Sequence, residues 1–153
     1  FGAICPVFRL HGFRKPLVIA EEGKAFIAGD AKSWDYTSGS PNEVWSFGET
    51  VYKICEKYMR LREKMRPYLM EQMIAAHEKG TPVMRPLFYD YPSDPAAWEL
   101  EDEYMLGPDL LVAPVTAEGK REREIYLPEG KWICLHTGET RQGGRNVNAE
   151  AAL

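Results

Sequence analysis

The chain has 153 residues, of which 44% are hydrophobic and 27% are charged, and its formal net charge at pH 7 is −4. This length and composition suffice for the core of one soluble globular domain. The mild negative charge and the lack of a basic, aromatic-interleaved patch argue against a nucleic-acid partner. No segment approaches the roughly 20 uncharged apolar residues of a membrane helix, which argues against a membrane partner.

The three cysteines, Cys5, Cys55 and Cys134, are odd in number and far apart, and each stands among apolar neighbours. This usage is typical of small buried hydrophobic residues in a reducing compartment, not of a disulfide framework or a metal site, and it favours a cytoplasmic location. The sequence begins inside an apolar run at Phe1, without a methionine or a signal-peptide pattern. We therefore expect an excised piece of a larger protein.

The first predicted element is a strand over residues 3–10, where apolar residues follow one another without strict alternation. This pattern favours a strand that is covered on both faces, as in a parallel sheet. The stretch CPVFRLHG places His11 at the end of this strand, and alternation puts Arg9 on the same face. An unpaired buried charge costs several kcal/mol, so a structural ion pair is favoured for Arg9 over a position in a pocket wall. Residues 12–43 form a long loop, a kind of segment that is usually functional or mobile.

A long amphipathic helix follows this loop. Ser46 and Glu49 have the spacing of a capping box, and Pro67 is expected to break or kink the helix before a second piece ends at Gly80. The stripe that recurs at intervals of three and four consists of Val51, Ile54, Cys55, Tyr58, Leu61, Arg62 and Met65.

The next predicted elements are a strand over residues 82–89, interrupted by Pro86, and a short helix that begins at Asp94 and Pro95 and runs to Gly107. A structural ion pair is the favoured interpretation of Arg85 inside this strand. The order strand, loop, helix, strand, helix is typical of a βα array and predicts the α/β class.

The pattern changes after Gly107, where short strands over residues 109–115, 123–128 and 131–135 are separated by turn residues. Such runs predict an antiparallel sheet. We expect a domain boundary near Gly107, with residues 1–106 and 107–153 on its two sides.

Six motifs cover nearly the whole chain up to about Trp132, in the order CPVFRLHG, WSFGE, LREKMRPYL, GTPVMRPLFYDYPSDP, EYMLGPDLLVAPV and YLPEGKW. Together they resemble the C-terminal part of glycoside hydrolase family 31, which includes α-glucosidases, α-xylosidases and related retaining enzymes.

The resemblance implies a (β/α)8 TIM barrel followed by a small β-sandwich. Residues 1–106 would supply the last two βα units of the barrel, and residues 107–153 would begin the antiparallel β-sandwich domain. The implied function is hydrolysis of terminal α-linked glucose or xylose from an oligosaccharide or glycoside, without a cofactor. The sequence leaves the choice between glucose and xylose open.

The resemblance also assigns a role to His11, whose counterpart hydrogen-bonds a hydroxyl of the sugar that precedes the cleaved bond. Functional side chains of such barrels lie at the C-terminal ends of the strands. An imidazole suits a hydroxyl because one ring nitrogen donates and the other accepts. Without the surrounding motif, a histidine that satisfies a loop carbonyl would be the better interpretation.

Aromatic side chains around the long loop offer a further sugar contact, because their faces pack against the C–H faces of pyranoses. Trp34 and Tyr36 lie in the loop, and Trp45 stands beside the helix start, where packing against the helix is the alternative. His77 and His136 have no partner at metal-ligand spacing, so we expect both to be solvated or structural, with no metal bound.

No catalytic residue is assigned in this chain. Retaining glycosidases use two carboxylates about 5 to 5.5 Å apart. In the resembled family these are aspartates of a W-x-D-x-x-E and an H-W-x-G-D motif, neither of which occurs here. The acidic residues present, such as Asp30, Asp35, Asp90 and Asp94, do not match those motifs.

The chain alone is therefore expected to be inactive. Because two βα units cannot close a barrel, we also expect either self-association that covers exposed apolar surface or a compact local rearrangement. The alternative function is a non-catalytic carbohydrate-binding or protein-interaction module.

Overall fold

The computed structural model describes residues 1–9, 17–19, 25–27 and 44–151. The chain divides into two compact units, Val7–Leu61 and a second unit made of Phe1–Pro6 with Arg62–Leu153. The fold is α/β with small antiparallel sheets, because every strand pairing among the described residues is antiparallel.

The N-terminal strand expected over residues 3–10 is wrong for the residues that the structure describes. A 3-10 helix, η1 (Gly2–Ile4), begins the chain, and the following residues up to Arg9 are irregular. The physical reason is that the carbonyl oxygens of Ala3, Cys5 and Pro6 accept hydrogen bonds from a side chain, Arg62, and not from a neighbouring strand.

The segment expected to be one loop over residues 12–43 contains a short hairpin. Its strands are β1 (Leu17–Ile19) and β2 (Ala25–Ile27), paired with Leu17 opposite Ile27. The other residues of this segment lie outside the described ranges.

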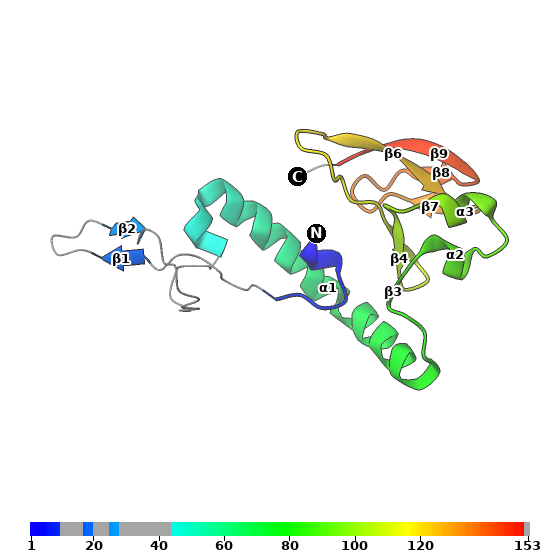
Figure 1. Ribbon diagram of the computed structural model, residues 1–153, viewed down its shortest axis with the longest axis horizontal. Helices are drawn as coiled ribbons and strands as arrows, with labels where there is room; N and C mark the ends of the chain where they lie inside the picture. The colour runs from blue at the N-terminus through cyan, green and yellow to red at the C-terminus, as the bar shows by residue number, and fades with distance from the viewer. Residues whose placement is uncertain (10–16, 20–24, 28–43, 152–153) are drawn as a thin grey trace. The chain divides into compact units, whose positions relative to one another are not determined.

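The long helix is not broken at Pro67, where a break was one of the two expected outcomes, and it ends directly before Gly80, as predicted. A 3-10 helix, η2 (Val44–Phe47), precedes α1 (Glu49–Lys79), which has 31 residues with Pro67 inside it (Figure 1). The capping box is also wrong, because Glu49 occupies the first helical position and not the third, directly after Gly48 at φ +90°. Pro67 lies at an exposed position of the helix.

The strand expected over residues 82–89 is shorter than predicted. It consists of β3 (Met84–Arg85), and Pro86 is the N-cap of α2 (Leu87–Asp90). The proline therefore ends the strand and starts a helix, because its fixed φ suits a helix start and it donates no hydrogen bond to a sheet.

The helix start at Asp94 is confirmed: its side chain accepts a hydrogen bond from the Ala96 amide at 3.0 Å and caps α3 (Pro95–Glu99). The predicted extension of this helix to Gly107 is wrong, because β4 (Tyr104–Leu106) follows. Gly107, at φ +63°, turns the chain into β5 (Leu110–Val112).

These strands form a three-stranded antiparallel sheet in the order β3-β4-β5. All three residues of β4 are buried. Because side chains alternate along a strand, Tyr104 and Leu106 face Leu69 and Val83 in one core cluster, whereas Met105 joins Leu87 and Ala97 in a second. The central strand thus has α1 on one face and α2 with α3 on the other, as Figure 1 shows.

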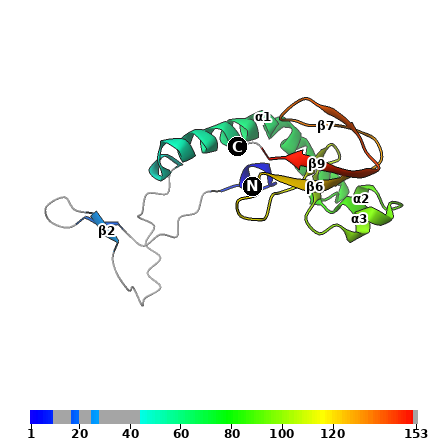
Figure 2. The ribbon, with the colours of Figure 1, turned by 90° about the horizontal axis from the view of Figure 1, so that it is seen from above.

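The C-terminal strands are antiparallel, as predicted, but the three predicted strands lie in three different sheets and not in one. β6 (Glu122–Leu127) pairs with β9 (Arg145–Glu150), and β7 (Lys131–Ile133) pairs with β8 (Thr140–Gln142). Figure 2 shows β6 and β9 side by side in a second view. Tyr126 and Trp132 from these strands pack against the second core cluster.

Candidate functional site

The predicted sugar-binding residue His11 lies outside the described residues, as do Trp34 and Tyr36. The structure does describe the segment that leads to His11. This segment, residues 1–6, belongs to the same compact unit as the chain from Arg62 onward.

The side chain of Arg62, in α1, donates hydrogen bonds to backbone carbonyl groups of this segment. Nη1 donates to the carbonyl oxygens of Ala3 at 3.0 Å and Cys5 at 2.5 Å, and Nη2 donates to that of Pro6 at 2.9 Å. A planar guanidinium presents several donors in a rigid fork, and its charge strengthens each bond. Three carbonyls of an irregular segment are thereby satisfied by one half-buried side chain.

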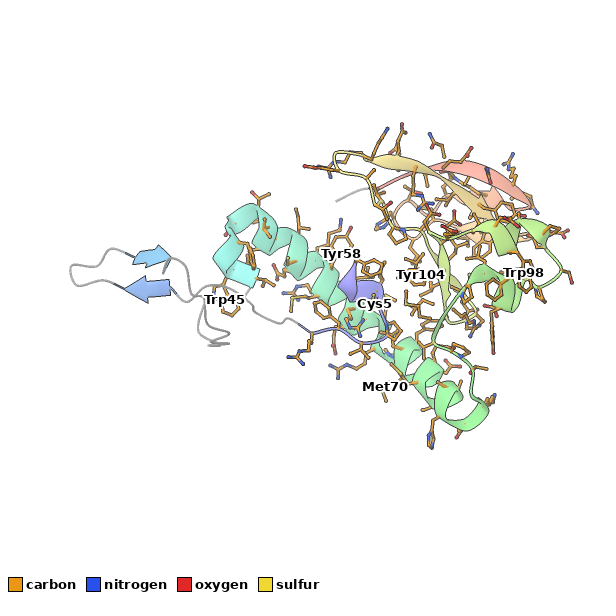
Figure 3. All side chains as sticks on the ribbon, in the orientation of Figure 1. Cys5, Trp45, Tyr58, Met70, Trp98 and Tyr104 are labelled. Carbon is orange, nitrogen blue, oxygen red and sulfur yellow. The ribbon has the colours of Figure 1, made fainter. Side chains whose placement is uncertain are left out.

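Tyr104 of β4 provides a second support for the same segment. Its hydroxyl donates to the carbonyl oxygen of Ile4 at 3.3 Å, and the ring of Phe1 packs edge-on at a centroid distance of 6.3 Å. Burial raises the pKa of Tyr104 to about 12, so the hydroxyl keeps its proton at neutral pH. Figure 3 shows Cys5 of this segment beside α1.

The structural interpretation of Arg85 is confirmed. Its side chain is 6% exposed and forms a forked pair with Asp90, with Nε–Oδ2 at 2.6 Å and Nη2–Oδ1 at 2.9 Å. Nη1 also donates to the carbonyl oxygen of Pro82 at 3.1 Å. Arg9, in contrast, is exposed and lies in irregular chain, so the argument from a buried strand face does not apply to it.

A buried carboxyl group, Glu103, lies where the β3-β4-β5 sheet meets β6. Its side chain is 1% exposed; Oε1 accepts from the Tyr126 amide at 2.8 Å and lies 3.5 Å from Nη2 of Arg123. The other oxygen, Oε2, is buried without a hydrogen-bond partner. Burial raises the pKa of Glu103, and the nearby charge of Asp102 adds to this, while the Tyr126 amide and Arg123 lower it.

The acidic residues that the sequence left without a catalytic role have contacts within the fold where they are described. Asp90 pairs with Arg85, and Asp94 caps α3 and accepts a hydrogen bond from the Tyr126 hydroxyl at 2.7 Å. This bond is the largest cause that raises the pKa of Tyr126 to about 12. Asp30 and Asp35 lie outside the described residues.

The remaining candidates are scattered. Trp45 is 67% exposed, which contradicts packing at the helix start, and His77 and His136 are exposed, as expected for solvated residues. The three cysteines are free and half-buried. Within the described ranges, no cluster of three or more potential ligands could hold a metal ion, and none of their helices could span a membrane.

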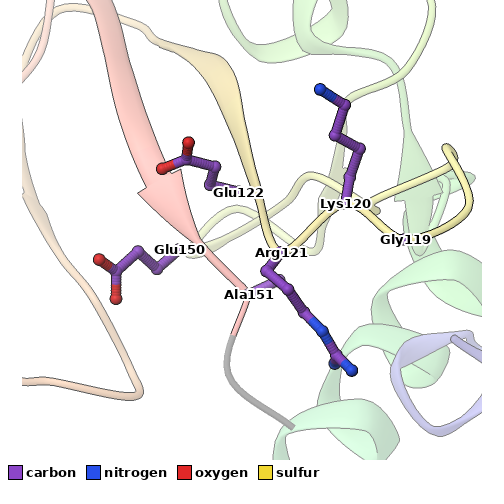
Figure 4. A pocket seen from close by; sticks show the side chains of 6 residues that line it. All are labelled: Gly119, Lys120, Arg121, Glu122, Glu150 and Ala151. Carbon is purple, nitrogen blue, oxygen red and sulfur yellow. The ribbon is translucent and has the colours of Figure 1, made fainter.

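A hollow of about 370 Å³ lies at the edge of the sheet formed by β6 and β9. Figure 4 shows that the charged ends of its side chains point in different directions, and Lys120, Arg121, Glu122 and Glu150 are all exposed. Because binding sites bring polar groups together, the hollow is not assigned a function.

Sequence reasoning missed Arg62 and Glu103 as residues that organise the structure. A signal existed for Arg62, because it stands in the apolar stripe of the predicted helix, where a charge requires a partner. No comparable signal existed for Glu103, whose burial depends on β4 replacing the end of a predicted helix.

Comparison with known proteins gives consistent results. A family model described as "Glycosyl hydrolase family 31 C-terminal domain" matches residues 80–153. "Alpha-glucosidase 2" of Bacillus thermoamyloliquefaciens is 43% identical over 94% of the chain, and the "Alpha-xylosidase" of Saccharolobus solfataricus is 35% identical over 100%. The chain spans 15% and 18% of these two proteins, respectively.

The solved structures include a GH31 alpha-xylosidase from a soil metagenome, complexed with xylose. It matches 98% of the chain with a TM-score of 0.82 and 46% identity, and the chain covers 22% of it.

Proposed function

The chain belongs to glycoside hydrolase family 31, and we propose that it is part of a retaining α-glycosidase that hydrolyses terminal α-linked glucose or xylose from oligosaccharides. The observation that carries this proposal is similarity over nearly the whole chain to an α-glucosidase and to α-xylosidases. We favour it over a non-catalytic binding module because these matched proteins are enzymes.

The chain's own share in this activity is to hold the sugar, not to attack it. The two catalytic aspartates expected for such an enzyme belong to motifs that this sequence lacks. His11 is proposed to hydrogen-bond a hydroxyl of the sugar before the cleaved bond, with Arg62 and Tyr104 holding the segment that precedes it.

We place this segment in the last two βα units of a (β/α)8 barrel. Support comes from the similarity of the chain to enzymes of the family over nearly its whole length.

The division of the chain into residues 1–106 and 107–153 stays a proposal. Strand β4 before Gly107 pairs with β5 after it, so one sheet extends over both sides of the proposed boundary. Limited proteolysis of the full-length enzyme is the measurement that would locate the boundary.

Self-association of the chain alone also stays a proposal. It is supported by large apolar side chains that are exposed along α1. These are Val51 at 41%, Met59 at 41%, Met70 at 55% and Ile74 at 52% exposure.

The test of the activity uses the full-length enzyme and two substrates, an aryl α-glucoside and an aryl α-xyloside. We expect hydrolysis of at least one, with the α-anomer of the sugar released first, because a double displacement retains configuration. Proton NMR during the first minutes distinguishes the anomers before they equilibrate. Release of the β-anomer first, or no hydrolysis of either substrate, would contradict the proposal.

The role of His11 is tested separately by His11→Ala in the same enzyme. The loss of a donor and an acceptor to one hydroxyl should lower kcat/KM by the equivalent of about 1–3 kcal/mol. His77→Ala is the matched control, because that histidine is exposed near the end of α1. Unchanged kinetics of His11→Ala would leave His11 with a structural role only.

A further inference from the structure

We infer that Arg123 couples the C-terminal strands to the chain before Gly107, because its side chain joins the sheet β6-β9 to the sheet β3-β4-β5. This coupling goes beyond the proposed sugar hydrolysis and is independent of it. All residues that take part belong to the one compact unit that includes Arg62–Leu153.

The two sheets have no backbone pairing with each other among the described residues. β4 pairs with β3 and β5, whereas β6 pairs with β9. Apolar contacts do exist, because Tyr126 of β6 packs against the core cluster that contains Met105 of β4. Such contacts are non-directional, so the directed bonds between the two sheets come from side chains.

Arg123 of β6 supplies most of these directed bonds. Its Nη2 lies 2.6 Å from Oδ2 of Asp102, and its Nη1 donates to the carbonyl oxygens of Asp102 at 3.2 Å and Pro114 at 2.7 Å. Asp102 precedes β4 and Pro114 follows β5, and the start of β4 pairs with the end of β5. One guanidinium therefore holds both segments at the same end of the β4-β5 pair.

The bonds of Arg123 are partly shielded from water. Its side chain is 17% exposed and lies 3.5 Å from Oε1 of the buried Glu103, which also accepts the Tyr126 amide. Hydrogen bonds of charged groups are stronger than neutral ones, and a buried group that loses its partner costs more than an exposed one. Removal of the guanidinium takes a donor from Pro114 and a positive charge from Asp102 and Glu103.

The segment held by β6 extends back to α3. Tyr126, three residues after Arg123, donates its hydroxyl to Oδ2 of Asp94 at 2.7 Å, and Asp94 caps α3. Between α3 and β4 the chain is irregular over residues 100–103. Irregular backbone depends on side chains for its position. We therefore expect an opening at Arg123 to spread through the segment from α3 to the start of β4 and not to stay within β6.

Hydrogen exchange of the full-length enzyme, followed by mass spectrometry, tests this coupling with Arg123→Gln. The method measures local opening segment by segment. Exchange should become about 10-fold faster in residues 95–104 as well as in residues 122–127, because the same side chain holds both. Residues 70–79 of α1 should change by less than about twofold, since α1 contacts β4 through apolar side chains that the substitution does not alter.

Three further variants make the result specific. Arg121→Gln is the matched control and should leave exchange unchanged, because Arg121 carries the same charge two residues earlier and is exposed. Arg123→Lys keeps the charge on a flexible stem without the fork of donors, so exchange should rise in both joined segments by less than with Arg123→Gln. Adding Asp102→Asn to Arg123→Gln should have little further effect, because the carboxylate has already lost its cation.

Faster exchange in residues 122–127 alone would overturn the inference, because Arg123 would then stabilise only its own strand. An exchange pattern identical to that of Arg121→Gln would overturn it as well. A rise of the same size in residues 70–79 would do so too, since it would mean a general loss of stability. If Arg123→Gln does not fold, as judged by thermal unfolding, Arg123→Lys takes its place and must show faster exchange in both joined segments.

Discussion

The buried carboxyl group of Glu103 connects two sheets, but its burial has a cost in folding free energy. Its Oε1 accepts the Tyr126 amide, which joins β4 to β6, whereas its Oε2 is buried without a partner. An unpaired buried oxygen costs about 1–3 kcal/mol. Arg123 does little to offset this, because it lies closer to Asp102, at 2.6 Å, than to Glu103, at 3.5 Å.

The raised pKa of Glu103 leads to a pH-dependent prediction. Because the folded protein holds this proton more tightly than the unfolded chain, the contribution of Glu103 to stability is fully present below the unfolded pKa near 4.5 and is lost as pH rises through the folded value. Glu103→Gln keeps an acceptor for the Tyr126 amide and removes the charge. At pH 7.5 it should raise the free energy of unfolding of this region by about 1 kcal/mol.

Thermal or denaturant unfolding of the full-length enzyme at pH 5 and pH 7.5 measures this effect. The gain from Glu103→Gln should be smaller at pH 5, where more of the native Glu103 is protonated. Glu101→Gln is the matched control, because Glu101 is exposed two residues earlier. A Glu103→Gln variant that is less stable at pH 7.5 would mean that the attraction to Arg123 outweighs the burial of the charge.

At the scale of elements, the sequence predicted best where a local signal was sufficient. The cap at Asp94, the amphipathic α1 and the strands after Gly107 each follow from residues within a few positions of one another, and the structure confirms them. The helix expected through Tyr104 failed because β4 is determined by its neighbours β3 and β5 and by burial on both faces. Apolar periodicity in so short a segment cannot distinguish these two outcomes.

The predicted helix break at Pro67 and the predicted N-terminal strand are wrong for related reasons. A proline inside a helix removes one hydrogen bond, yet α1 continues because Leu69 and other residues beyond Pro67 pack against the core formed with Val83 and Tyr104. The run at residues 3–9 has the composition of a strand, but its Cys5 and Pro6 carbonyls accept hydrogen bonds from the side chain of Arg62. Local sequence does not contain the contacts that decide either case.

The candidate site was predictable only in part, and through motifs more than through physical pattern. The structural pair of Arg85 with Asp90 followed from the cost of burying a charge. The role of His11 stays a prediction, because that residue lies outside the described ranges. The anchor by Arg62 required the structure, since it links residues 56 to 59 positions apart.

At the scale of the whole molecule, the proposed reaction requires catalytic groups that have not been identified in this chain. Two carboxylates about 5 to 5.5 Å apart are required, one as nucleophile and one as acid and base. Three aspartates within the described ranges instead have structural contacts: Asp90 pairs with Arg85, Asp94 caps α3, and Asp102 pairs with Arg123. Each of these carboxylates already has a cationic or hydrogen-bonding partner.

We therefore expect the 153-residue chain alone to show no hydrolysis of an aryl α-glucoside or an aryl α-xyloside. Without the nucleophile, binding of a sugar by His11 does not lower the activation free energy of hydrolysis. Positioning accelerates a reaction only when the reacting groups are present. The measurement is release of the aryl alcohol at equal molar concentrations of chain and full-length enzyme. Turnover that rises in proportion to the chain and persists after repurification from a host lacking such glycosidases would contradict this expectation and would place a catalytic carboxylate among residues 1–153.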